Sequence, residues 1–129
     1  KNYNYIIDGT DNFSSKLIIN NECIKNKKKL FIGSVSQFDA HLFFFDFSNY
    51  SPCLKCFMPK APHISPSCQD EGILGTVTGS AGTIIANELI KDTTGIKSNL
   101  QNHVLIMNLE TLNFRKVKIN KSKKCKNHE

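Results

Sequence analysis

Long apolar runs are missing from this chain of 129 residues. A membrane-spanning helix needs about 18 or more apolar residues in succession, and here the longest run is broken near Phe45 and Asp46. A basic-then-apolar leader is also missing, so nothing indicates a signal peptide. These absences predict a cytoplasmic protein without a membrane partner. The start at Lys1 rather than at methionine leads us to expect a fragment of a longer protein.

Arginine is almost missing, although the chain carries a formal net charge of +6 and a sequence pI near 9.1. Arg115 is the one arginine among 17 basic residues, and 16 Lys, 14 Asn and 14 Ile together make up 44 of the 129 residues. These three amino acids have A/T-rich codons, so base composition explains the basicity without a polyanionic partner. We therefore expect no nucleic-acid partner.

Cysteines are few and odd in number, with five in the chain. Cys53 and Cys56 form a C-x-x-C pair, Cys125 and His128 form a C-x-x-H pair, and Cys23 and Cys68 stand alone. A secreted disulfide framework usually has an even count of cysteines. The pattern therefore favours a metal site with spare thiols in a reducing cytosol.

The first part of the chain has the pattern of a strand, a helix and two further strands. The strands are expected at Tyr5–Ile7, Leu30–Val35 and His41–Phe47, and the helix at Phe13–Ile24. A strand, a helix and a second strand make a βαβ unit, so the first two strands should be parallel. The polar residues between the first strand and the helix should form a loop at the strand's carboxyl end.

The expected first helix has apolar residues at helical spacing, namely Phe13, Leu17, Ile18, Cys23 and Ile24. We expect this stripe to face the core, which makes Cys23 a packing residue. Asn12 or Ser14 is placed to cap the N-terminus of the helix.

The second part of the chain begins with a long loop, because all four prolines lie between Ser48 and Gly72. A helix from Gly72 to Lys91 follows, and its small residues allow close approach of another backbone, whether a sheet, a helix or a second subunit. The segments His103–Leu109 and Phe114–Ile119 predict a hairpin. The predicted fold class is α/β, with a Rossmann-like mixed sheet that has a parallel βαβ start and an antiparallel C-terminal hairpin.

The two spaced pairs are the strongest chemical signal in the sequence. Cys53, Cys56, Cys125 and His128 offer four N/S donors, which suits a tetrahedral Zn²⁺ ion. Four protein ligands leave no open position, so this zinc would be structural and would clasp the C-terminal tail to a mid-chain loop. His63 is an alternative fourth ligand, and a redox dithiol at the C-x-x-C pair is the alternative function.

The segment Asp8-Gly-Thr-Asp11-Asn12 follows a strand, where open α/β sheets bind ligands. Carboxylates there commonly hold Mg²⁺ for a nucleotide phosphate, and the alternative is an Asx-rich turn that caps the next helix. No G-x-G-x-x-G precedes this strand. Cys68 is a third candidate, because a helix N-terminus stabilises a thiolate, although Asp70 and Glu71 act against this and a lone loop cysteine is often incidental.

Four segments in one order combine into a more specific signal. They are Ile7-Asp-Gly-Thr-Asp-Asn12, Pro52-Cys-Leu-Lys-Cys56, Ser67-Cys-Gln-Asp-Glu-Gly-Ile-Leu-Gly75 with Thr78-Gly79, and Phe114-Arg115 before the terminal pair. In this order and spacing the chain resembles the ThiF/MoeB/HesA superfamily, the bacterial relatives of ubiquitin-activating enzymes. The resemblance covers nearly the whole chain and implies that residues 1–129 are the C-terminal half of an adenylation domain.

The resemblance implies an ATP-dependent adenylyltransferase that activates the C-terminal glycine of a ubiquitin-like sulfur-carrier protein, of the molybdopterin or thiamine type. It assigns Asp11 to catalysis with Mg²⁺, Asn12 and Lys16 to the ATP site, and Cys68 to a covalent link with the carrier or to sulfur transfer. It also implies a structural zinc on the four ligands given above and a homodimer.

This sequence departs from the family in four places. His128 replaces a cysteine, Lys16 stands where an arginine is usual, and residues 36–41 lack the usual glycine pattern. The glycine-rich nucleotide loop of the family would lie before Lys1, so we expect the chain alone to bind ATP poorly. The alternative function is a non-catalytic zinc-stabilised interaction module left from an eroded or split enzyme.

Overall fold

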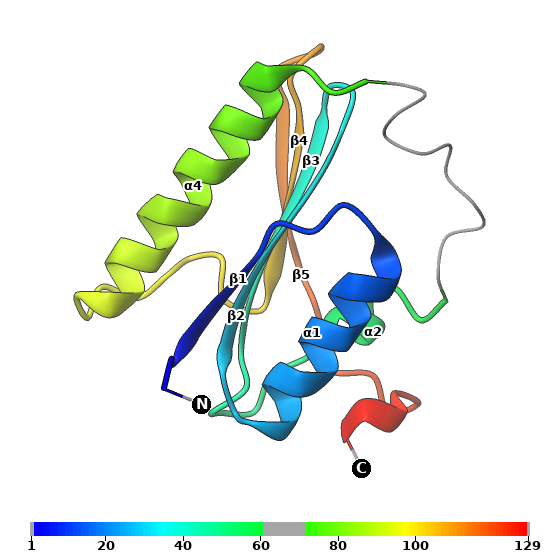
Figure 1. Cartoon of the computed structure of the whole chain (residues 1–129), viewed down its shortest axis with the longest axis vertical. Coiled ribbons are helices and arrows are strands. Elements are labelled where there is room, and N and C mark those ends of the chain that lie inside the picture. Colours follow the sequence, from blue (N-terminus) through cyan, green and yellow to red (C-terminus); the bar gives the residue numbers. More distant parts are fainter. Residues whose placement is uncertain (1, 61–71, 129) are drawn as a thin grey trace.

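A computed structural model describes residues 2–60 and 72–128, and of residue 128 it describes the backbone alone. The elements follow the order β1 (Tyr5–Asp8), α1 (Phe13–Lys25), β2 (Lys29–Ser36), β3 (Asp39–Asp46), α2 (Leu54–Phe57), α4 (Gly75–Thr93), β4 (His103–Asn108), β5 (Asn113–Lys118) and a terminal 3₁₀ turn, η1 (Lys126–His128) (Figure 1). In the parts of the chain that the model describes, no helix is long and apolar enough to cross a membrane.

The five strands form one mixed sheet in the order β1-β2-β3-β4-β5. β1 runs parallel to β2, whereas β2, β3, β4 and β5 pair antiparallel in succession. The parallel start and the C-terminal hairpin are therefore both as the sequence predicts. The parallel pair brings the carboxyl ends of β1 and β2 to the same edge of the sheet, where Asp8 pairs in register with Ile32.

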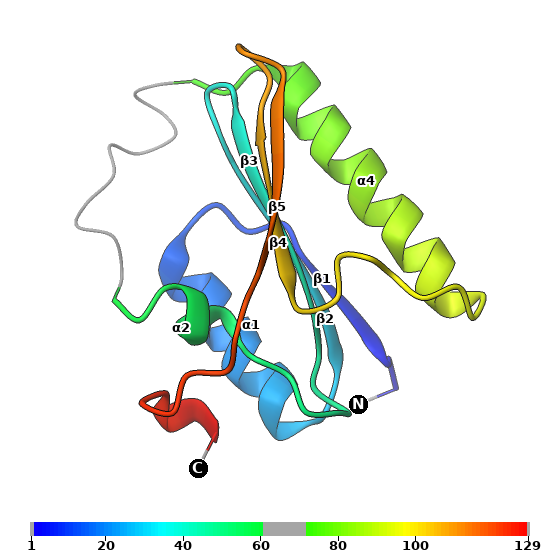
Figure 2. The same cartoon turned by 180° about the vertical axis from the view of Figure 1, so that it is seen from behind.

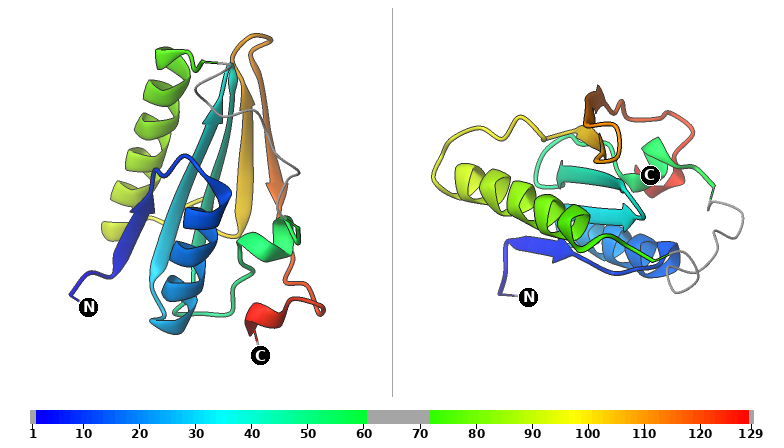
Figure 3. Two further views of the ribbon diagram at one scale, coloured as in Figure 1. Left: turned by 45° about the vertical axis from the view of Figure 1, so that its right-hand side comes forward. Right: turned by 90° about the horizontal axis from the view of Figure 1, so that it is seen from above.

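Two apolar cores lie on opposite faces of the sheet, because successive side chains of a strand point to opposite faces. One core contains Leu30, Ile32, Phe43 and Phe45 from the strands and packs against α1, α2 and the C-terminal tail, by which we mean residues 121–128. The other contains Phe31, Leu42, Phe44 and Met107 and packs against α4. Helices thus cover both faces of the sheet, and Figures 1 and 3 show the resulting three layers.

Helix α1 differs from its predicted apolar stripe at Ile18, whereas Phe13, Leu17 and Ile24 pack against the core as predicted. Its buried residues are Lys16, Asn20 and Cys23, whereas Ile18 is 64% exposed. The prediction for Ile18 was wrong, because positions 16, 20 and 23 share one face of a helix and that face meets the sheet. Cys23 packs in the core as predicted, and the side chain of Asn12 caps the helix by accepting a hydrogen bond from the Ser15 N–H at 2.8 Å.

The loop after β3 contains a short helix that the sequence did not predict. Helix α2 places Cys56 one turn beyond Cys53, which is the N-cap residue. Figure 2 shows the C-terminal tail beside α2 and α1, so the two ends of the expected zinc clasp do meet. The long helix α4 begins at Gly75 and not at Gly72, which has a positive φ of 70°. Among the described residues, no heavy atom approaches within 4 Å of an added Cβ at Gly79 or Gly82.

The C-terminal part of α4 is fixed to the sheet by a group of polar contacts that we call the α4 anchor. The carboxylate of Asp92 accepts hydrogen bonds from the Tyr5 hydroxyl at 2.7 Å and from the Lys29 ammonium at 2.6 Å. Glu88 accepts from the Ser98 hydroxyl at 2.6 Å and from the Lys91 ammonium at 2.9 Å. These contacts connect α4 to β1, to β2 and to the segment that leads into β4.

Candidate functional site

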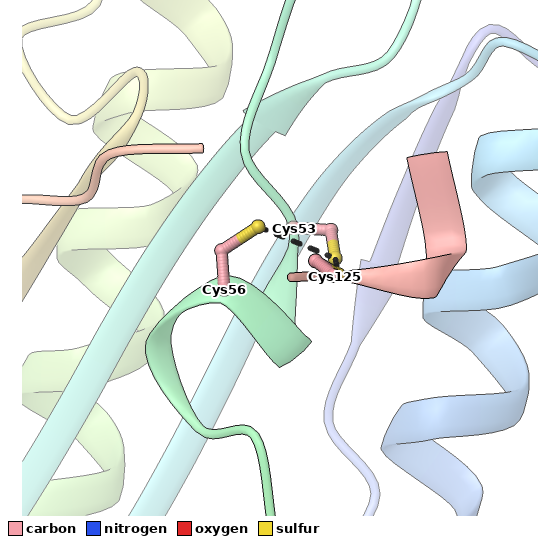
Figure 4. Close-up of side chains that lie close together, drawn as sticks. All are labelled: Cys53, Cys56 and Cys125. Carbon is pink, nitrogen blue, oxygen red and sulfur yellow. Dashed lines mark hydrogen bonds between the residues drawn. The ribbon is translucent and has the colours of Figure 1, made fainter. Parts of the chain in front are cut away.

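Three cysteine side chains from two distant segments meet beside α1 (Figure 4). The Sγ atom of Cys53 lies 4.0 Å from that of Cys56 and 3.7 Å from that of Cys125. All three Sγ atoms lie within 4.8 Å of one another. We call Cys53, Cys56 and Cys125 the cysteine cluster, and its sulfur atoms are too far apart for a disulfide, whose S–S bond is about 2.05 Å long.

The sulfur separations fit a tetrahedral metal ion. With Zn–S bonds of about 2.3 Å, two sulfur ligands of a tetrahedron lie about 3.8 Å apart. The Cys53–Cys125 separation of 3.7 Å and the Cys53–Cys56 separation of 4.0 Å bracket that value. Both separations from Cys53 therefore suit zinc, and the whole cluster could hold a metal ion.

The surroundings of Cys53 argue against a redox dithiol. Cys53 is fully buried, and burial raises the pKa of its thiol to about 12; a hydrogen bond with the backbone of Cys56 acts to lower this pKa, whereas the side chains of Cys56 and Cys125 act to raise it. Thiols that carry out redox exchange have the opposite property, because a lowered pKa supplies the reactive thiolate. A bound cation would instead stabilise the thiolates and reverse this preference.

The fourth ligand that the sequence predicts lies outside the described side chains. His128 belongs to η1, three residues after Cys125, but its side chain is not described. The alternative ligand His63 lies in residues 61–71, outside the described residues, and so does the candidate catalytic thiol of Cys68. The assignments of these three residues stay predictions.

The second candidate site is the loop between β1 and α1, where Asp8 has a structural role. Its Oδ1 atom accepts hydrogen bonds from the backbone N–H of Thr10 at 2.8 Å and from the Thr10 hydroxyl at 2.7 Å. Its Oδ2 atom lies 3.3 Å from the Lys16 ammonium. Asp8 is 1% exposed and forms the Asx turn that the sequence offered as the alternative to a metal site.

Lys16 points into the protein beneath this loop. Its ammonium donates to Asp8 and also to the backbone carbonyl of Gly33 on β2, at 2.7 Å. Burial lowers the pKa of Lys16, while the charge of Asp8 acts in the opposite direction. Two of its three donor protons are therefore committed to the fold. The predicted contact of Lys16 with ATP would need the third proton or a rearrangement of this pair.

Asp11 is the carboxylate of the loop that stays open to solvent. Its Oδ1 atom accepts a 3.2 Å hydrogen bond from Asn12, whose own amide oxygen caps α1. The sequence predicted roles at the ATP site for Asp11 and Asn12, and the structure gives the three polar residues Asp8, Asp11 and Asn12 of this loop different roles. Asp8 shapes the loop, Asn12 caps the helix, and Asp11 is left with coordination capacity for a cation.

A cavity of about 470 Å³ opens next to Asp11, between the carboxyl ends of β1 and β2 and the part of α4 from Thr78 to Leu89. Its described lining is mostly apolar and consists of Ile7, Asp8, Gly9, Thr10, Asp11, Gly33, Ser34, Val35, Ile73, Thr78, Ala81, Gly82, Ile85, Ala86 and Leu89. None of these described lining residues is basic, and because Asp8 is paired with Lys16, Asp11 is the carboxylate of the described lining that has no ammonium partner in the contacts given above. A phosphate group could bind such a wall through a divalent cation.

Several residues beside the cysteine cluster escaped prediction. Asn20, which is fully buried, accepts a 3.0 Å hydrogen bond from the backbone N–H of Leu54 and so holds the start of α2. Asn127 donates to Asn21 at 2.8 Å and accepts from Lys55 at 3.3 Å. Their partners lie far away in the sequence, and abundant asparagine gives no local signal.

The fold and the two sites define a three-layer α/β domain with a mostly apolar cavity, edged by Asp11, at the carboxyl ends of its parallel strands and a cysteine cluster that could hold a metal ion. The family model described as the ThiF family matches residues 1–127, and the chain belongs to this family.

Relatives with known names are similar to the chain over most of its length. It is 29% identical to a sulfur carrier protein adenylyltransferase of Thermus thermophilus, over 95% of this chain and 48% of the relative. It is 32% identical to the adenylyltransferase and sulfurtransferase MOCS3 of Aedes aegypti, over 95% of this chain and 28% of the relative. The chain thus spans about half, or less, of the length of the curated relatives that it matches.

Solved structures agree on the fold. Escherichia coli MccB in its complex with ATP superposes with a TM-score of 0.77 at 11% identity, over 95% of this chain and 39% of that chain. MccB with AMPCPP and MccA gives a TM-score of 0.78 at 12% identity, over the same 95% of this chain and 39% of that chain. At such low identity the likeness shows the arrangement of strands and helices and does not extend to ligands.

Proposed function

We propose that this chain is the C-terminal half of an adenylation domain that activates the C-terminal glycine of a ubiquitin-like sulfur-carrier protein with ATP. The ThiF family match over residues 1–127 and relatives named as sulfur-carrier adenylyltransferases support this function. The observation that carries it is the cavity at the carboxyl ends of β1 and β2, with Asp11 at its edge. That position is where open α/β sheets bind their ligands.

The charge of the cavity explains why this chain would need an N-terminal half to form a complete ATP site. Asp11 is suited to hold Mg²⁺, which when bound neutralises phosphate charge. Asn12 donates a hydrogen bond to Asp11, and Lys16 donates one to Asp8 in the same loop. The described lining contains no basic residue that would contact the phosphates directly. We infer that the cationic and glycine-rich parts of an ATP site come from an N-terminal half, and that this chain alone binds ATP poorly.

The cysteine cluster has a separate, structural part in this proposal. A Zn²⁺ ion held by Cys53, Cys56, Cys125 and, as we propose, His128 would clasp the tail to α1 and α2, far from the cavity. Three converging thiols need a reducing compartment, which supports a cytoplasmic location. Cys68 as the carrier-linked thiol and a homodimeric parent enzyme are further parts of the proposal that come from the family resemblance.

Complementation tests the proposed activity. The chain is mixed with an N-terminal half of a ThiF-family domain, and ATP–pyrophosphate exchange is measured with ubiquitin-like carriers of the molybdopterin and thiamine types. We expect exchange when both halves and a matching carrier are present. Absence of exchange with every carrier, while the carriers still bind, would instead support the alternative of a non-catalytic zinc-stabilised interaction module.

A variant pair assigns the activity to the cavity. Asp11→Asn should reduce exchange on the order of 100-fold, because it removes the charge that holds the cation at the site of developing phosphate charge. Glu110→Gln, an exposed acidic residue in the turn between β4 and β5, is the matched control and should leave exchange unchanged. Equal exchange rates for the two variants would remove Asp11 from the proposed site.

A further inference from the structure

We propose that Asn127 is a positioning residue that docks the C-terminal tail so that Cys125 reaches the other two cysteines before metal binds. This inference rests on the proposed zinc site and concerns a residue that is not itself a ligand. Asn127 lies two residues after Cys125 and contacts two helices at once. Its Nδ2 atom donates to Oδ1 of Asn21 on α1 at 2.8 Å, and its Oδ1 atom accepts from the Lys55 ammonium on α2 at 3.3 Å.

The same part of α1 also holds the other cysteine segment. Asn20 and Asn21 are neighbours, and Nδ2 of Asn20 donates to Oδ1 of Asn21 at 3.3 Å. The Oδ1 atom of Asn20 accepts from the backbone N–H of Leu54, the first residue of α2. Two adjacent asparagines on α1 therefore fix both the helix that carries Cys56 and the tail that carries Cys125. We call Asn20, Asn21 and Asn127 the amide chain.

The orientation of the amide chain is determined at both of its ends. The backbone N–H of Leu54 can only donate, so the oxygen of Asn20 must face α2 and its NH₂ group must face Asn21. The ammonium of Lys55 also can only donate, so the oxygen of Asn127 must face Lys55 and its NH₂ group must face Asn21. Oδ1 of Asn21 accepts from both neighbours, and all three amides are mutually consistent.

The tail has few other side-chain contacts that would order it. Lys123, Lys124 and Lys126 are exposed. The tail turns at Ser122, whose backbone N–H points at Sγ of Cys56 at 3.4 Å and whose carbonyl accepts from the N–H of Cys125 at 3.1 Å. Ordering a free tail costs conformational entropy, so contacts that order it before metal binding increase the effective concentration of Cys125 at the cluster. Outer contacts of this kind typically change metal affinity about 10- to 100-fold.

Zinc affinity of the complete chain tests this role. Affinity is measured by competition with a chromophoric chelator, and Asn127→Ala should bind Zn²⁺ on the order of 10-fold more weakly than the original chain. Asn120→Ala is the matched control, because Asn120 is an exposed asparagine shortly before the same tail. Asn21→Ala should weaken binding to a similar degree. The double variant should lose less than the sum of the two single losses, because both changes remove the same Asn127–Asn21 hydrogen bond.

A second measurement without metal separates this inference from the proposed zinc site. Alkylation of the metal-free chain is followed by mass spectrometry, and Asn127→Ala should label Cys125 several-fold faster while leaving the rate at the buried Cys23 unchanged. A chain that binds no zinc but shows this change would refute the zinc site and keep the docking role. Alkylation and affinity in Asn127→Ala equal to those in Asn120→Ala would overturn the role of Asn127.

Discussion

The cysteine cluster and the α4 anchor both tie distant segments to the sheet, but they do so with different chemistry. At the cluster, cysteine side chains and amides meet, and Cys53 is fully buried. At the anchor, the carboxylates of Asp92 and Glu88 meet the ammonium groups of Lys29 and Lys91. One region thus offers sulfur ligands that suit a metal ion, whereas in the other region the carboxylates are paired with lysine side chains of the same chain.

The difference indicates that the two faces of the sheet should respond to different conditions. The face under α1 and α2 should gain stability from metal, because thiolates crowded in a buried cluster need a cation. The face under α4 should be indifferent to zinc, and its anchor should respond to charge and pH, because the anchor contacts are ion pairs and hydrogen bonds to carboxylates. The cavity beside Asp11 lies on the α4 side, so ligand binding there need not depend on the cluster.

Removal of a cluster ligand should have the largest effect. Cys53→Ala takes away the most buried sulfur, and we expect zinc affinity to fall by more than about 100-fold, beyond the range of outer contacts. Amide hydrogen exchange should accelerate in α2 and the tail and should stay unchanged in α4. Cys23→Ala is the control, because Cys23 is buried in the same core but lies outside the cluster. Equal zinc affinities of the two variants would show that the cluster is not the metal site.

Loss of the central cation of the α4 anchor should have the next largest effect. Lys29→Met leaves Asp92, whose side chain is 12% exposed, with the Tyr5 hydroxyl as its remaining described anchor contact. We expect the free energy of unfolding to fall by about 2 kcal/mol, as for other hydrogen bonds to charged groups, without a change in zinc affinity. Denaturant titration of the original chain and of Lys29→Met measures the difference in the free energy of unfolding.

The control for Lys29 is a lysine in an exposed pair. Lys25 contacts Glu22 on the surface of α1, where both side chains are more than half exposed. Lys25→Met should therefore change stability by less than about 1 kcal/mol. If the two lysine variants unfold alike, the α4 anchor contributes no more than a surface ion pair. If Lys29→Met also weakens zinc binding, the two regions are coupled and the contrast between them fails.

The sequence was sufficient for the parts of the fold that local patterns encode. Hydrophobic runs predicted β1, β2 and the β4–β5 hairpin, and the spacing of Cys53, Cys56 and Cys125 predicted their meeting. The order of motifs predicted the family. These features depend on periodicity or on residue types whose chemistry is distinctive, and neither needs knowledge of a distant partner.

Contacts between distant polar residues were not predictable in the same way. Lys16 and Asn20 lie on the buried face of α1, where each has a hydrogen-bond partner from a later segment, Gly33 and Leu54 respectively. Hydrophobic periodicity instead favoured Ile18, which is exposed. The Tyr5–Asp92 contact joins residues that are 87 positions apart. Buried polar residues are stabilised by tertiary partners, so a pattern of apolar residues alone misplaces them.

Glu88 gives the smallest and most specific test of the contrast, through pH. Burial acts to raise the pKa of Glu88, but hydrogen bonds from Ser98 and Lys91 outweigh it and hold the pKa below the ordinary value of 4.5. The unfolded chain therefore binds this proton more readily than the folded chain. The stability from Glu88 is fully present above pH 4.5 and is lost as the pH falls through the lower folded-state pKa.

Glu88→Gln should remove this part of the acid dependence, because the amide oxygen can still accept from Ser98 but carries no charge to lose. Denaturant unfolding of the metal-free chain at pH values from about 3 to 6 should therefore show a shallower decline for the variant than for the original chain. Glu22→Gln, an exposed glutamate on α1, should decline like the original chain. Parallel curves for all three would mean that charge at α4 does not stabilise this face. If zinc enlarged the difference in acid dependence between Glu88→Gln and the original chain, the anchor and the cluster would be coupled. That result would contradict the independence that their chemistry predicts.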